Sequence, residues 1–299
     1  MSRYLSDAAA QQFDADVAHD FQAMGYTLMG SCRERRGVIG DTYNFRRMGT
    51  GQATQRSAPS VDVTPMDVSH DLIPCALSAW EASEYTDIFS QTDVNFSERR
   101  ELSQTIAGAL GRRVDQLIID AIESTSNVPG QSKAFLNDGA DITADIGGNN
   151  SNLNITKIRQ AASLMDAANV PAMDRYWLAH SNQKQGILGE DKATSSDYMN
   201  LKALVQGDIN TFYGFKFIWI GDRDEGGLSM ADADDRYNYA FHKRALGAAI
   251  ALSVSTSVDW VPQKKSWLSS GETKLGAVKT DANGVVRILC DDNATYNGA

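Results

Sequence analysis

The spacing of apolar residues predicts two amphipathic helices in the first half of the chain. Residues 7–24 carry apolar side chains at every third or fourth position, namely Phe13, Val17, Phe21 and Met24. A stronger helical pattern covers residues 97–125, with Glu98 and Glu101 placed near the positive end of the helix dipole. Its apolar side, which we expect to form a packed core, contains Leu102, Ile106, Leu110, Val114, Leu117 and Ile118. With a rise of about 1.5 Å per residue, this helix would be roughly 40 Å long, more than most globular domains need.

Between these two helices the pattern changes to short apolar islands broken by glycine and proline. Residues 26–91 therefore predict strands, turns and an extended arm, with little material for a compact core. Residues 33–56 hold six arginines against two acidic residues. Two interpretations stay open: a solvated basic loop, or a surface that contacts a neighbouring subunit. The candidate contact residues are Arg33, Arg35, Arg36, Arg46 and Arg47.

The middle of the chain predicts an α/β portion. The pattern favours a helix over 155–168, a strand over 175–179, a turn of helix near 183–188 and a strand over 212–220. The polar stretches are expected to be loops, at 127–154 and, with many acidic residues, at 222–235. Residues 237–253 contain an apolar run that fits a helix and a buried strand equally well.

The last segment carries the sequence signal of a β-hairpin. Strand-like runs at 274–280 and 285–291 flank a turn that contains Asn283 and Gly284. An Asn-Gly step between two such runs favours a tight hairpin turn. We therefore expect the two runs to pair with each other.

Composition narrows the class of protein. The chain has 299 residues, a formal net charge of −10 and a pI near 4.9, which argues against a surface that wraps nucleic acid through its phosphates. The most apolar uncharged stretch, 245–258, falls short of the roughly 20 residues that span a membrane. The N-terminus lacks an apolar signal segment, which predicts an intracellular product.

The sequence contains no recognisable catalytic or metal-binding pattern. The four histidines are scattered, and the three cysteines, Cys32, Cys75 and Cys290, fit neither a disulfide framework nor a zinc site. The glycine-rich segment 49–54 lacks the third glycine and the lysine of phosphate-binding loops. Asp222 begins a stretch that is similar to a calcium loop, but Ala233 stands where the bidentate glutamate belongs. We expect no enzyme activity, no cofactor and no metal.

Several short motifs, in order along the chain, resemble one protein family. Arg99-Arg100-Glu101-Leu102 leads into ALGRRVDQLIIDAI at 109–122, and Gly214-Phe215-Lys216-Phe217, AFHKRA at 240–245 and the presumed hairpin at 276–286 follow. Together they resemble the major capsid (coat) proteins of tailed bacteriophages with the HK97-like fold, in particular a podovirus-type group. Each motif alone has modest specificity, but the resemblance covers most of the chain.

The resemblance implies an α+β architecture. Residues 1–28 would be an N-terminal arm and 29–92 an extended β loop. Residues 93–154 and 256–299 would form a peripheral domain with a spine helix at 97–125, and 155–255 an axial α/β domain. The first 132 residues contain no lysine, which excludes a cross-linking lysine on the extended loop.

The resemblance also implies partners. Copies of the chain would assemble, in the host cytoplasm, into hexamers and pentamers of an icosahedral phage head around double-stranded DNA, without specific DNA recognition or a membrane. A portal is implied, and the absence of a precursor segment ahead of the arm suggests a separate scaffolding protein. The alternatives are an unrecognised α+β enzyme, another virion component, or a cellular shell protein of the same fold.

Overall fold

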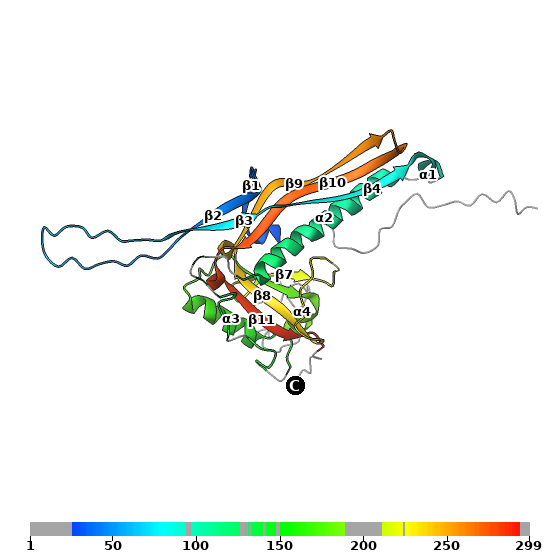
Figure 1. Ribbon diagram of the computed structural model, residues 1–299. Helices are drawn as coiled ribbons and strands as arrows, with labels where there is room; N and C mark the ends of the chain where they lie inside the picture. Colours follow the sequence, from blue (N-terminus) through cyan, green and yellow to red (C-terminus); the bar gives the residue numbers. More distant parts are fainter. Residues whose placement is uncertain are drawn as a thin grey trace, which may run out of the picture.

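The computed structural model of this chain describes residues 26–93, 97–125, 129, 131, 133–139, 142–147, 150–188, 211–223 and 225–293. The helix expected over 7–24 lies outside these residues. Figure 1 shows three parts: a two-stranded arm on one side, a long sheet with a helix along it, and a second sheet beside the start of that sheet.

The predicted long helix is confirmed as α2 (Glu98–Glu123), which runs along a four-stranded sheet (Figure 1). The sheet has the order β1 (Arg33–Arg36), β9 (Leu246–Val261), β10 (Ser266–Lys279), β4 (Ser78–Asp87). Helix and sheet approach closely because β10 has a glycine at the crossing. A Cβ atom on Gly271 would lie 2.5 Å from Cγ2 of Ile106 and 2.8 Å from Cδ1 of Leu110. The sheet therefore leaves room for the apolar stripe of α2.

A separate five-stranded sheet forms the second part of the body. Its order is β11 (Val285–Asp291), β8 (Asp235–His242), β5 (Arg175–His180), β7 (Phe215–Ile220), β6 (Thr211–Phe212), and only β5 and β7 run parallel. Helices α3 (Ile155–Ala167) and α4 (Ser181–Leu188) confirm the predicted helical segments. Successive residues of β5 enter different cores, since Trp177 packs in the cluster of α3 and Leu178 in the cluster of α2.

The ambiguous run at 237–253 consists of strands. It covers most of β8, the short 3-10 helix η2 (Lys243–Ala245) and the start of β9. Both faces of β9 are covered there, because Ala248 belongs to the core of α2 and Ala249 to the core below the arm. A strand covered on both faces needs no alternation of polar residues, which is why the pattern could not distinguish it from a helix.

The predicted C-terminal hairpin is wrong. β10 pairs with β9 and β4, whereas β11 pairs with β8 in the other sheet. Asn283 and Gly284 lie in a 3-10 turn, η3 (Ala282–Gly284), that carries the chain from one sheet to the other. The tight packing of this turn explains its glycine, since a Cβ atom on Gly284 would lie 2.6 Å from Cβ of Ala245. The hairpin in this region is β9–β10.

The strand predicted over 212–220 is interrupted by a turn. Tyr213 and Gly214 both have positive φ, 50° and 82°, and join β6 to β7 as a tight hairpin in which Phe212 pairs with Phe215. The aromatic pattern of this segment predicts strand residues but gives no sign of the reversal.

The remaining elements lie before α2. They are η1 (Met29–Ser31), the arm strands β2 (Thr42–Met48) and β3 (His70–Ala76), and the short helix α1 (Ile88–Asp93). Extended structure is expected up to residue 91, but it ends with β4 at Asp87, and the next residues form the helix α1. β4 falls within the predicted extended loop, yet it pairs with β10 over ten residues. The domain boundaries themselves stay a prediction.

The segment predicted as a loop at 127–154 contributes to the core where the structure describes it. Phe135, Ile142 and Leu153 are buried, and Ile142 forms an isolated bridge with Ile288 of β11. The buried Lys279 holds this segment to the end of α2. Its Nζ donates hydrogen bonds of 2.6 Å to the carbonyl oxygens of Ser124 and Ala134.

Lys279 gives a prediction about pH. Burial lowers its pKa to about 8, from 10.5 in the unfolded chain. Between these values the unfolded chain binds more protons, so the free energy of unfolding should rise with pH, by about 1 kcal/mol between pH 7 and 9. Urea unfolding of the wild type and Lys279→Met should show this rise only with the lysine. A stability difference between the two proteins that stays constant over this range would contradict the prediction.

Candidate assembly interface

The arm has almost no core of its own. Its base is held by a small cluster of buried side chains: Phe45, Ile73, Cys75, Leu77, Ala249 and Val278. Beyond the base, Gly49 N donates to Ser69 O at 2.8 Å, and every residue from 50 to 67 is exposed. A two-stranded ribbon is only marginally stable in water by itself. The arm projects from the body, as Figure 1 shows, and beyond its base no other described segment packs against it.

One side of the β2–β3 hairpin is uncovered along its whole length. We call this the outer hairpin face; its residues, all exposed, are Asn44, Arg46, Met48, His70, Leu72 and Pro74. Met48 is 66% exposed and Leu72 is 57% exposed. Exposed apolar side chains next to a cation are typical of a surface that meets a partner.

Three of the five arginines named as contact candidates interact within the chain. Arg33 lies 5.7 Å above the ring of Phe45. Arg36 pairs with Glu34 of its own strand at 2.9 Å. Arg47 pairs with Asp281 at 3.1 Å, which links the arm to the turn after β10.

The other two arginines, Arg35 and Arg46, are exposed and form no ion pair with any residue that the structure describes. The five therefore do not form one site. The five arginines lie at the base of the arm. The outer part of the arm, 49–69, is not basic, since it contains one arginine, Arg56, and two acidic residues, Asp62 and Asp67.

The residues expected to form the core of the long helix lie along its sheet side. Ile106, Leu110, Val114 and Ile118 are buried, with exposed fractions of 7%, 3%, 1% and 0%, whereas Leu102 and Leu117 are half-buried. The helix is thus packed most tightly in its second half.

Sequence reasoning missed Asp115, a fully buried carboxylate on the packed side of α2. It accepts hydrogen bonds from the backbone N of Thr27 and of Leu28, both at 3.0 Å, and pairs with Arg223 at 3.0 Å. An acidic residue between Val114 and Ile118 is the only sequence signal. Asp115 therefore holds two segments against α2: residues 27–28, near the start of the described chain, and the loop after β7 that contains Arg223.

The acidic loop at 222–235 is not simply solvated. Its Asp222 and the buried His180 approach within 3.2 Å, and Asp222 pairs with Arg236 at 3.1 Å. Arg236 also pairs with Asp292 at 2.7 Å. Burial lowers the pKa of His180, which favours the neutral ring. Through the ion pairs of Arg236, the start of β8 is joined to the chain after β7 and after β11 in the five-stranded sheet.

The cysteines are poor nucleophiles. All three are free and buried. Burial raises the pKa of Cys32 to about 12 and the pKa of Cys75 and Cys290 to about 11, so each stays a thiol at neutral pH.

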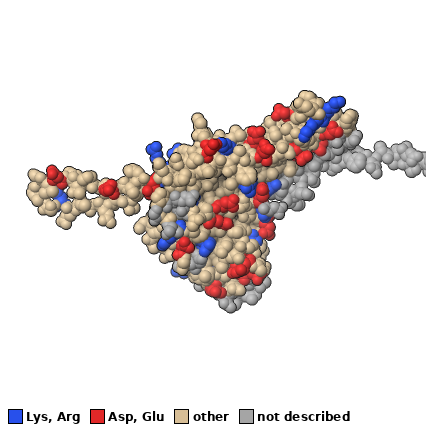
Figure 2. Space-filling view, in the orientation of Figure 1, with Lys and Arg blue, Asp and Glu red and all other residues tan. Residues whose placement is uncertain are grey.

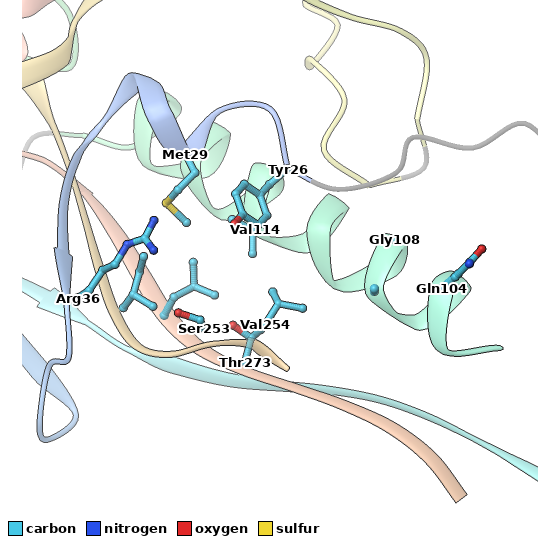
Figure 3. A pocket seen from close by; sticks show the side chains of 12 residues that line it. Tyr26, Met29, Arg36, Gln104, Gly108, Val114, Ser253, Val254 and Thr273 are labelled. Atoms are coloured by element: carbon cyan, nitrogen blue, oxygen red, sulfur yellow. The ribbon is translucent and has the colours of Figure 1, made fainter. Parts of the chain in front are cut away.

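A groove of about 510 Å³ lies between α2, η1 and the sheet (Figure 3). Tyr26, Met29 and Arg36 line one end, and Gln104 and Gly108 of α2 line the other. Among the described residues that line the groove, Arg36 alone is charged, so they provide no acid–base pair for catalysis.

The described part of the chain shows neither a metal site nor a membrane-spanning helix. It has no group of three or more His, Cys, Asp or Glu side chains arranged to hold a metal ion. None of its helices combines the length and apolar character needed to cross a bilayer.

Solved structures with the same fold are phage capsids. The capsid of the cyanophage P-SCSP1u matches with a TM-score of 0.71 and 14% identity, covering 97% of this chain and 95% of that chain. The mature capsid of bacteriophage PhiM1 matches with a TM-score of 0.70 and 15% identity, covering 99% and 98%. The head of Helicobacter pylori bacteriophage KHP40 matches with a TM-score of 0.70 and 11% identity, covering 98% and 100%.

The sequence comparison agrees with the fold. No curated protein matches this sequence significantly. A family model described as phage capsid protein matches residues 5–292, nearly the whole chain. The chain therefore belongs to the phage capsid protein family, and it is a structural protein of the virion shell with the HK97-like fold, not an enzyme.

Proposed function

We propose that copies of this chain form hexameric and pentameric rings of an icosahedral phage head, in which the arm of each copy lies on the next copy. The observation that carries this proposal is the β2–β3 arm, which exposes Met48 and Leu72 and has no core beyond its base. A contact between different surfaces of two copies closes into a ring when the rotation between them fits.

The same proposal extends to the other partners. The shell would be assembled in the host cytoplasm, with a scaffolding protein and a portal, and would enclose double-stranded DNA. A net charge of −10 fits this role, because an acidic lining leaves packaged DNA free to move. A podovirus-type subgroup is also part of the proposal. Another virion component, or a cellular shell protein of this fold, is the alternative.

We also propose a division of the chain into functional parts. The arm and its neighbours at 29–92 would bridge subunits. Residues 93–154 and 256–299 would form the peripheral domain, and 155–255 the axial domain at the centre of each ring. The long sheet with α2 supports a rigid periphery.

Assembly is tested directly with the expressed full chain. Gel filtration and negative-stain electron microscopy of the concentrated protein, co-expressed with its scaffolding protein, should show rings or closed shells. A monodisperse, folded monomer of 32.5 kDa at high concentration would contradict the proposal. An irregular aggregate without rings would contradict it as well.

The arginines at the base of the arm are expected to act together. One exposed ion pair contributes less than about 1 kcal/mol, so single substitutions should matter little. Replacing Arg33, Arg35, Arg36, Arg46 and Arg47 by glutamate should abolish or misdirect assembly, and raised salt should weaken assembly of the wild type. Circular dichroism of the unassembled protein should stay unchanged.

The matched control replaces the same five arginines by lysine. This variant keeps the charge and should assemble nearly as well as the wild type. Normal yield and particle size from the glutamate variant would show that the basic run is only a solvated surface.

A further inference from the structure

The four-stranded sheet has a second face, opposite α2. The base of the arm covers this face at the start of β9, and nothing described in this chain covers it farther along. The side that meets α2 is identified by Arg113 of the helix, which lies 3.8 Å above the ring of Trp80, and by Gly271 below Ile106. Side chains alternate along a strand, so the neighbouring residues point away from the helix. We call them the outer sheet face: Glu81, Ser83, Tyr85, Asp87, Ser255, Ser257, Asp259, Leu268, Ser270 and Glu272.

This face is acidic, and two of its negative charges lie directly opposite each other on neighbouring strands. Glu81 of β4 and Glu272 of β10 are direct partners in the strand register, and both are exposed. Like charges directly opposite each other destabilise a sheet. No described lysine, arginine or histidine forms an ion pair with either glutamate. Figure 2 shows acidic side chains gathered over this sheet.

The nearest lysines are already engaged. Lys274 pairs with Asp41 at 2.6 Å. Lys264, in the turn between β9 and β10, lies 3.8 Å above the ring of Tyr85. The outer sheet face carries four acidic side chains, Glu81, Asp87, Asp259 and Glu272, and its central pair, Glu81 and Glu272, has no ion-pair partner among the described residues.

The outer hairpin face has the complementary composition. It carries Arg46 without an acidic side chain, flanked by the exposed apolar residues Met48 and Leu72. Tyr85, 41% exposed, offers apolar surface on the outer sheet face. Both surfaces are faces of β-sheets, and opposite charge on two such surfaces gives register and specificity to a contact.

We propose that the outer hairpin face of one copy docks on the outer sheet face of the next copy, with Arg46 placed over Glu81 and Glu272. This inference rests on the proposed assembly and names the acidic surface that receives the arm. The unfavourable glutamate pair is then balanced only in the assembled shell, which favours the contact between copies over the free subunit.

Charge reversal tests the pairing. Arg46→Glu alone, and Glu81→Lys with Glu272→Lys, should each lower the fraction that sediments as particles by about tenfold, because every copy repeats the weakened contact. Combining all three substitutions should restore most of the yield. Glu84→Lys, in the same strand on the side of α2, is the matched control and should assemble normally. Circular dichroism should show that each variant folds.

Two outcomes would overturn this inference. They are normal assembly of the double lysine variant, and a triple variant no better than its parents. Neither outcome would contradict the proposed assembly, which is judged by whether the wild-type protein forms rings or shells.

Cross-linking gives an independent readout. The first 132 residues contain no lysine, so Arg46→Lys places a single amine on the arm. A carbodiimide should join this amine as an amide to Glu81 or Glu272, with loss of water. In shells assembled from mixed isotope-labelled and unlabelled copies, mass spectrometry should find this peptide pair between copies, and not in the unassembled protein. Links of this amine only to other carboxylates would refute the docking.

Discussion

Ile118→Asp is expected to leave the protein insoluble. Ile118 is fully buried on the sheet side of α2, in the same apolar cluster as Tyr239 and Leu246. An unpaired carboxylate in such a place costs several kcal/mol, which is comparable with the whole stability of a domain of about 5–15 kcal/mol. Leu110→Asp, about two turns earlier on the same stripe, should behave in the same way. The measurement is the soluble fraction of the expressed protein.

Ile118→Val is the control for this prediction. It removes one methylene group and should cost only about 0.5–1.5 kcal/mol, so the protein should stay soluble. If Ile118→Asp and Leu110→Asp together gave soluble protein that still assembles, this side of α2 would have to be exposed.

Asp115→Ala is expected to lower the free energy of unfolding by about 3–5 kcal/mol, because it leaves Arg223 as a buried charge without its partner. The backbone N–H groups of Thr27 and Leu28 would lose their acceptor as well. Chemical unfolding of the unassembled protein measures the loss. Removing one partner of a buried pair costs more than replacing both, so adding Arg223→Met should recover part of the stability.

Asp120→Ala provides the comparison on the same helix. Asp120 is exposed and accepts a hydrogen bond of 2.7 Å from Gln116, so its loss should cost less than about 0.5 kcal/mol. Equal effects of Asp115→Ala and Asp120→Ala would show that the buried pair has no special weight.

Asp115 also connects different parts of the subunit. The carboxylate joins the spine of the molecule to the chain that leads in from the N-terminal segment, and through Arg223 to the loop after β7. The long sheet and the five-stranded sheet therefore share one buried polar link beside their common apolar core, which includes Val114, Leu178 and Leu246.

Local sequence was sufficient for helices α2, α3 and α4, whereas the short helix α1 fell partly in a segment predicted to be extended. The apolar stripe of residues 97–125 repeats with the period of a helix over seven turns, and its polar side stays in water, so the pattern predicts α2 before any partner is known. The same holds for α3 and for β5, whose patterns depend on their own residues. The resemblance that pointed to a phage coat protein also rested on such local motifs.

Pairing between distant strands was beyond the local pattern. Asn283-Gly284 has the composition of a hairpin turn, but β10 pairs with β9 and β4 while β11 pairs with β8, so the turn serves as a crossing between two sheets. The run at 237–253 became strand for the same reason, since only the tertiary structure covers both faces of β9.

For the charged residues, too, the sequence determined their number and distribution along the chain, and the tertiary structure determined their partners. Composition alone indicated an acidic protein with a basic segment in its arm, and it excluded the common catalytic patterns. Only the tertiary structure decided that Arg47 pairs with Asp281, that Asp115 is buried, and that Glu81 faces Glu272. Helix periodicity is a property of neighbouring residues, whereas an ion pair or a strand register depends on residues far apart in sequence, which folding alone brings together.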